Sequence, residues 1–179
     1  MDRVRRLLGF LIVLIVAGAV VLVVMVRPGL RHDAESVDRS WTPLVRPLDV
    51  RYQALDDVIA QLKASGAGKR KATLGLIQLV ERWRVIRSGT DTADQVETAN
   101  RIEALAARAD VLAHTARLGG AAPLQAAFKA FDASRPTTAV LAAYNNRVIT
   151  YQDRRDGFWS RIVASLDGYP MRPTLQLVS

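Results

Sequence analysis

The chain contains no cysteine and only two histidines among its 179 residues. The first absence excludes disulfide frameworks, thiolate zinc sites, iron–sulfur clusters and cysteine nucleophiles. It leaves the compartment open, because a helical domain of this length can be stable without disulfides on either side of a membrane. His32 and His114 lack the paired acids or histidines at helical spacing that a metal site requires. We therefore expect no metal and no cofactor.

Catalytic motifs are missing as well. The sequence holds no glycine-rich phosphate loop, no Walker motif and no Gly-x-Ser-x-Gly nucleophile turn. Asp56 and Asp57 are adjacent, so their carboxylates diverge on a helix, and Asp153 and Asp156 lie beside arginines, which favours ion pairing over acid–base chemistry. The sequence predicts that the protein is not an enzyme.

Acidic residues are too few to balance the basic ones, and the net charge is +8 with a pI near 10.6. This balance suits an anionic partner, but the basic residues are spread along the chain. Their densest run outside the N-terminus is Lys69, Arg70 and Lys71. This run is a candidate contact for an anionic surface, but three residues are few, and a solvated loop between helices explains them better. We expect no nucleic-acid partner.

Residues 7–26 form an uncharged apolar run of 20 residues. A helix of that length reaches about 30 Å, the thickness of the hydrocarbon core of a bilayer. A secretory signal peptide would have a shorter apolar core and a small-x-small cleavage site, so the run favours an uncleaved, single-pass transmembrane anchor. Arg3, Arg5 and Arg6 crowd into the flank at residues 1–6, which predicts a cytoplasmic N-terminus and an extracytoplasmic domain at the plasma membrane.

The remainder of the chain reads as one helical domain. Residues 27–39 show no apolar period and are expected to be a juxtamembrane connector, 40–168 a helical bundle and 169–179 a C-terminal tail. Apolar residues recur at steps of four and three and form a seam: Trp41, Val45, Leu48, Tyr52, Leu55, Ile59 and Leu62. This seam predicts the first helix of the bundle, whose regular part should begin at about Pro47.

Further helices follow from apolar spacing and from glycine and proline signals. We expect them at about 72–86, from Asp91 or Thr92 to the glycines at 119–120, from Pro123 through Phe131, and from about 137 to 166. The last should keep Phe158 on its inner face. The predicted fold is all-α: a transmembrane helix followed by an elongated antiparallel bundle of about four helices.

Two stretches resemble the LemA family of membrane proteins. Tyr144, Asn145, Val148, Tyr151 and Phe158 fall at the spacing of that family's Tyr-Asn-x-x-Val-x-x-Tyr-Asn motif, which is followed by Phe-Pro. The segment that contains Arg51, Tyr52 and Leu55 is similar to the family's Arg-Arg-Tyr-Asp-Leu segment.

The chain departs from the family pattern at two of these places. Gln152 stands where the second asparagine is expected, and Trp159 stands where the proline is expected. The resemblance implies an N-terminal transmembrane helix and a bundle of long helices, and it implies no reaction.

These features predict a membrane-anchored interaction or scaffold module of the cell envelope, with the lipid bilayer and an envelope protein as partners. The alternative is a protein that binds an anionic lipid or polyanion surface through its basic residues. Three tryptophans on apolar seams, Trp41, Trp83 and Trp159, are expected to serve packing rather than ligand stacking. The oligomeric state is left open.

Overall fold

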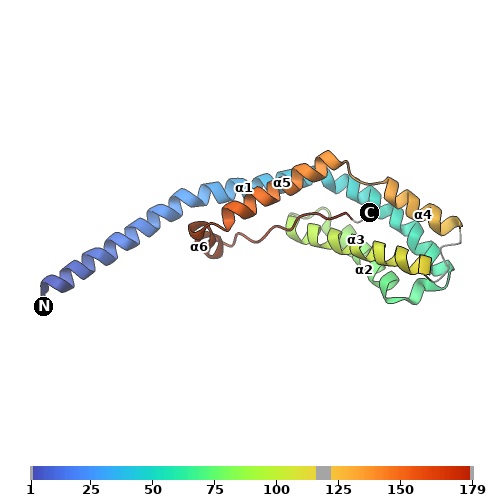
Figure 1. The fold of residues 1–179 in the computed structure, drawn as a ribbon, viewed down its shortest axis with the longest axis horizontal. Coiled ribbons are helices and arrows are strands. Elements are labelled where there is room, and N and C mark those ends of the chain that lie inside the picture. The colour runs from blue at the N-terminus through green and yellow to red at the C-terminus, as the bar shows by residue number, and fades with distance from the viewer. Residues whose placement is uncertain (1, 116–121, 178–179) are drawn as a thin grey trace.

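The structure is a computed structural model that describes residues 2–115 and 122–177. Within these ranges all regular secondary structure is helical, which confirms the all-α prediction. Figure 1 shows α1 running the length of the molecule, with α5 and α6 beside its middle and the pair α2 and α3 beside its C-terminal half. The elements are α1 (Asp2–Ala64), the short 3₁₀ helix η1 (Ala67–Lys69), α2 (Lys71–Ile86), α3 (Thr92–Thr115), α4 (Ala122–Ala133), α5 (Thr138–Arg155) and α6 (Phe158–Asp167).

Helix α1 is continuous where the sequence predicted a connector at 27–39 and a helix start near Pro47. Both predictions are wrong for the same reason. Leu30, Ala34 and Val37 are buried and extend the apolar seam upstream by steps of four and three residues. A proline inside a helix costs about 3 kcal/mol, and burial of the seam on both sides of the prolines offsets that cost.

The predicted transmembrane anchor at 7–26, and the single-pass topology drawn from it, are overturned as well. Among the helices of the described chain, none has an apolar stretch long enough to cross a bilayer. The apolar run is the beginning of α1 rather than a separate helix. Its last turn takes part in the fold, because Val23 and Val26 pack with Leu30 against Val163 and Ala164 of α6.

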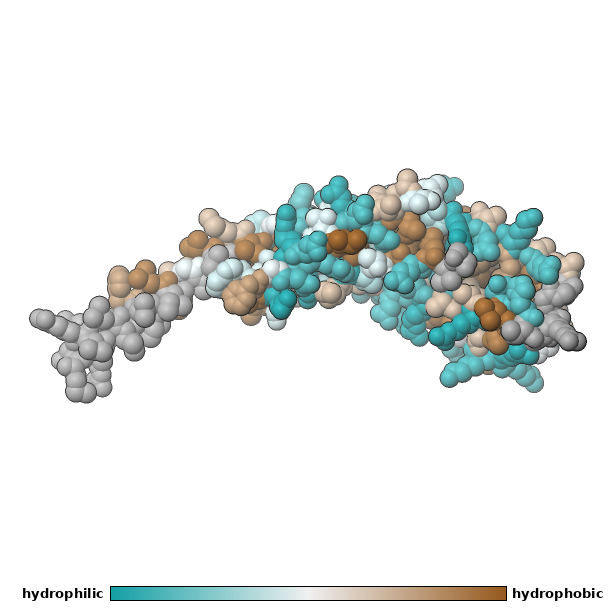
Figure 2. Space-filling view, viewed as in Figure 1, coloured by the Kyte–Doolittle hydropathy of each residue, from teal (hydrophilic) through white to brown (hydrophobic). Residues whose placement is uncertain are grey.

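The described part of this N-terminal arm also carries exposed apolar side chains, which Figure 2 shows as brown atoms next to the polar surface of the bundle. They are Phe10, Leu14, Val16, Val20, Val21, Val24 and Met25.

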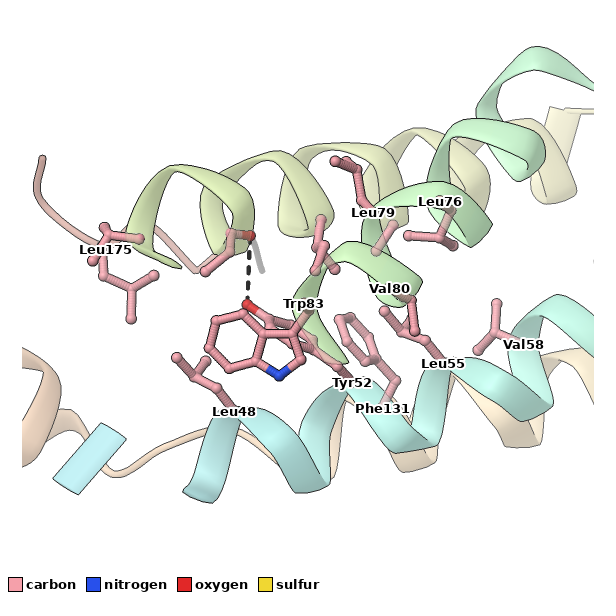
Figure 3. Packing of buried hydrophobic residues seen from close by; sticks show 14 of the residues in the cluster. Leu48, Tyr52, Leu55, Val58, Leu76, Leu79, Val80, Trp83, Phe131 and Leu175 are labelled. Carbon is pink, nitrogen blue, oxygen red and sulfur yellow. Dashed lines mark hydrogen bonds between the residues drawn. The ribbon is translucent and has the colours of Figure 1, made fainter. Parts of the chain in front are cut away.

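The main core forms where α1 packs against α2, α3, α4 and α5, and most of the seam predicted for α1 is buried in it. Tyr52 of α1 and Trp83 of α2 meet edge to face with ring centroids 5.1 Å apart. Figure 3 shows this pair between Leu48 and Val80, with Phe131 beside it. The predicted inner residues of α2 are all buried: Leu76, Leu79, Val80 and Trp83.

The helix predicted at about 137–166 is in fact two helices, α5 and α6. Gly157 has ψ of 144°, which is extended rather than helical, so the chain changes direction after Asp156. Helix α6 therefore turns only Val163 and Ala164 inward. Phe158 is 72% exposed, contrary to prediction, and α6 ends as expected at Gly168, whose φ of 70° suits glycine.

A buried ion pair joins α1 to α3 and α4. Arg51 donates to both carboxylate oxygens of Glu103, with distances of 2.8 Å from Nε and 2.9 Å from Nη2. Its Nη1 donates to the backbone oxygen of Phe131, and the guanidinium lies 3.7 Å from the centre of the Phe131 ring. Both charged side chains are almost fully buried. Each of these buried charges is therefore balanced by its partner inside the bundle.

Removing either partner should destabilise the protein strongly. Arg51→Met or Glu103→Leu leaves a buried charge without its partner, so we expect each to lower the free energy of unfolding by about 3 to 5 kcal/mol in urea denaturation. The double substitution should recover most of that loss. Arg82→Ala, which breaks a half-exposed ion pair with Asp94, is the control and should cost about 1 kcal/mol or less. A loss of similar size in Arg82→Ala would contradict this account.

Candidate binding groove along the C-terminal segment

The C-terminal segment, residues 169–177, has no regular secondary structure and lies along α5 in the opposite direction. Arg155 Nε donates to the backbone oxygen of Tyr169 at 3.1 Å, and the hydroxyl of Tyr151 donates to that of Pro170 at 2.8 Å. Further along the segment, Gln152 donates to the oxygen of Arg172, and Tyr144 donates to that of Pro173. Side chains of one helix face therefore bind the backbone of an extended chain.

The spacing of these side chains follows from helix geometry. The eleven residue steps of α5 from Tyr144 to Arg155 cover about 16 Å along the helix axis. The six steps of the extended chain from Tyr169 to Leu175 cover about 19 Å, so the two elements have similar lengths and can run side by side. Pro170 and Pro173 fix their own φ and push the preceding residues toward extended conformations, which favours this geometry.

Two asparagines hold opposite edges of the segment at Leu175. Asn145 of α5 accepts from the backbone N–H of Leu175 at 2.9 Å and donates to its oxygen at 3.0 Å. Asn100 of α3 donates to the oxygen of Thr174 and accepts from the N–H of Gln176, both at 2.8 Å. In an extended chain these two sets of groups point to opposite sides. Each carboxamide thus takes the place of a neighbouring β-strand.

Side-chain contacts fix the segment at two further points. Leu175 is 2% exposed and belongs to the main core. Arg172 Nη2 donates to Asp38 Oδ2 of α1 at 3.0 Å. The groove is therefore formed by three helices, α1, α3 and α5.

Burial keeps the tyrosine donors protonated. The ring of Tyr144 packs against Trp41 with centroids 5.2 Å apart, and burial raises the pKa of its hydroxyl far above the ordinary value. Burial also raises the pKa of Tyr151. Both hydroxyls can therefore donate to the backbone of the segment at any physiological pH.

The structure separates the residues that the sequence grouped as family-motif positions. Tyr144, Asn145 and Tyr151 come together in the groove, whereas Val148 lies in the core beneath it. Arg51, Tyr52 and Leu55 are buried core residues of α1. The side-chain hydrogen bonds of Arg51 and Tyr52 go to α3 and α4, not to the segment. Phe158 lies on the exposed face of α6.

The basic run is remote from the groove. Lys69, Arg70 and Lys71 are exposed where η1 meets α2, at the end of the molecule away from α6 (Figure 1). Among the residues that the structure describes, no hydrogen bond or ion pair connects them to the C-terminal segment. Their contact with an anionic surface stays a prediction.

Sequence reasoning missed four residues of the groove: Asp38, Asn100, Gln152 and Arg155. Gln152 had been noted as a departure from the LemA pattern, yet its carboxamide still donates to the segment, at 2.7 Å. The helical spacing of Tyr144, Tyr151 and Arg155 on one face was visible in the sequence. Their partner, an extended chain without apolar period, was not.

The comparisons with known proteins assign this groove no role. In the described ranges no cluster of histidines and acids is arranged to hold a metal ion. No family model matches the chain, and comparisons with curated proteins and with solved structures give no match either. The resemblance to the LemA family therefore stays a prediction.

Proposed function

We propose that this protein is a helical interaction module that binds an extended polypeptide segment of a partner in the groove between α1, α3 and α5. The observation that carries the proposal is the pair Asn100 and Asn145, which together satisfy both edges of an extended backbone. Because these bonds are made to the backbone, they do not depend on the side chains of the bound segment. A segment from another chain can make the same bonds.

The C-terminal segment occupies the groove in the described state, so a partner has to compete with it. A tethered segment acts at an effective concentration on the order of millimolar. Cutting the tether removes that advantage and exposes the intrinsic affinity of the groove. Gly168 is the place to cut, because its surroundings are open and it precedes the first residue of the segment that is held.

A protein cleaved after Gly168 should exchange its C-terminal segment with a peptide of the same sequence. We expect a fluorescent peptide of residues 169–179 to bind the cleaved protein, as measured by anisotropy, and a scrambled peptide, which moves Leu175 and both prolines, to bind more weakly. The uncleaved protein with the same inserted protease site should bind the peptide far more weakly, since its own segment competes. Failure of the peptide to bind a cleaved protein that keeps its helical circular dichroism would reject the proposed function.

Alanine at either asparagine should weaken this binding. Asn145→Ala and Asn100→Ala each remove two hydrogen bonds worth about 1 kcal/mol apiece, so we expect the dissociation constant to rise roughly thirtyfold in each. Asn146→Ala is the matched control, because this neighbouring asparagine is exposed and should leave the affinity unchanged. Equal affinities for all three variants would show that backbone recognition does not hold the segment.

A further inference from the structure

Several side chains of the C-terminal segment contact the bundle, and Leu175 and Arg172 are the two that most clearly give its ligand a chemical class, because Tyr169 and Leu177 are only partly buried against the core. Leu175 is 2% exposed, and the side chain of Arg172 is 13% exposed against Asp38. By contrast, Met171 and Gln176 are exposed, although the sulfur of Met171 accepts a hydrogen bond from Arg155. A bound segment is therefore selected by a basic residue and by an aliphatic residue three positions later.

The contact between Arg172 and Asp38 is incomplete. One hydrogen bond joins Nη2 to Oδ2, while Nε of Arg172 and Oδ1 of Asp38 are buried without a hydrogen-bond partner among the described residues. A buried polar atom without a partner costs free energy that a paired one does not. The segment of the chain itself is thus an imperfect occupant at this position.

The buried pair elsewhere in the same bundle shows what complete pairing requires. Arg51 meets Glu103 through two parallel hydrogen bonds and uses a third donor on a backbone oxygen. Bidentate pairs of this kind are stronger than single contacts. The carboxylate of Asp38 also has two acceptor oxygens, and Arg172 donates to only one of them. Asp38 can therefore accept a further hydrogen bond from a ligand.

The geometry points to a segment of a partner protein as the ligand of the groove: extended, with a basic residue opposite Asp38 and a leucine-sized residue in the Leu175 position. Residues 169–177 of the chain are then a displaceable occupant that holds the groove until such a partner arrives. This inference rests on the proposed function and adds the sequence class of the partner. The tether sets the affinity that a partner needs, because the partner has to outcompete a segment that is present at high effective concentration.

Peptide variants of residues 169–179, added to the protein cleaved after Gly168, test the two positions. We expect Arg172→Gln to weaken binding roughly tenfold and Leu175→Ala at least roughly thirtyfold. Arg172→Lys keeps the charge and should stay within about threefold of the parent peptide. Gln176→Ala, which changes an exposed side chain, is the control and should bind like the parent.

Charge reversal separates a specific contact from general attraction. Asp38→Arg in the protein should weaken the parent peptide, and an Arg172→Glu peptide should restore the affinity to within a few-fold. If the Arg172→Glu peptide does not restore the affinity, or if all Arg172 variants bind equally, the preference for a basic residue opposite Asp38 is wrong. Recognition of the segment's backbone would still stand. If no peptide binds, the proposed function itself fails.

The partner is tested with the intact protein. We expect sedimentation to show a monomer, because copies do not exchange their C-terminal segments. An excess of a peptide with a basic residue opposite Asp38 and a leucine in the Leu175 position should displace the tethered segment. A dimer that forms through Asn100 and Asn145, and that Asn145→Ala dissolves, would mean that the occupant is a second copy. That result would overturn the assignment to a partner protein.

Discussion

The continuity of α1 determines the arrangement of all other described elements. Each of α2, α3, α4, α5 and α6 packs against this single helix of 63 residues. Three prolines lie inside it, so its continuity depends on tertiary burial rather than on helix propensity. Leu30, Leu44 and Leu48 lie close to these prolines, and each is 0% exposed. Both pairs, α2–α3 at one end and α5–α6 at the middle, are thus attached to the same helix.

The groove follows from this arrangement. Because α3 and α5 both pack on α1, they present Asn100 and Asn145 to the same space from opposite sides. Leu175 and Asp38 then fix the segment to the core and to α1. A buried ion pair, Arg51 with Glu103, joins α1 to α3 within the bundle. The interaction surface is thus part of the bundle rather than an addition to it.

Much of the helical framework could be predicted from local pattern. The seam around Tyr52 and Leu55 and the inner face of α2 were found correctly because apolar residues recur there at helical spacing. The errors came where a local rule conflicts with packing. Pro47 indicated a helix start, but burial of the seam keeps α1 helical through it. The apolar run at 7–26 was predicted to be a separate transmembrane helix, although it is the beginning of α1 and its last turn packs on α6. Conversely, Gly157 ends a helix that the apolar period had carried through.

The groove could be predicted only in part, because its bonds connect positions far apart in the sequence. Tyr144, Asn145 and Tyr151 were identified through their spacing, but their partners lie 19 to 30 residues away in a segment with no periodic signal. Asn100 and Asp38 lie farther still from the residues they contact. Nothing in the identity of a lone asparagine on a helix face indicates that it will bind a backbone.

Amide hydrogen exchange of the intact protein tests the central claim most directly. The N–H groups of Leu175 and Gln176 donate to Asn145 and Asn100, so they should exchange at least about a hundredfold more slowly than in an unfolded chain. An excess of unlabelled segment peptide should accelerate their exchange, because it displaces the tethered segment and leaves those amides in water. Fast exchange of both amides in the protein alone would show that the groove does not hold an extended backbone. Protection that excess peptide leaves unchanged would show that the segment is a fixed part of the fold rather than a replaceable occupant.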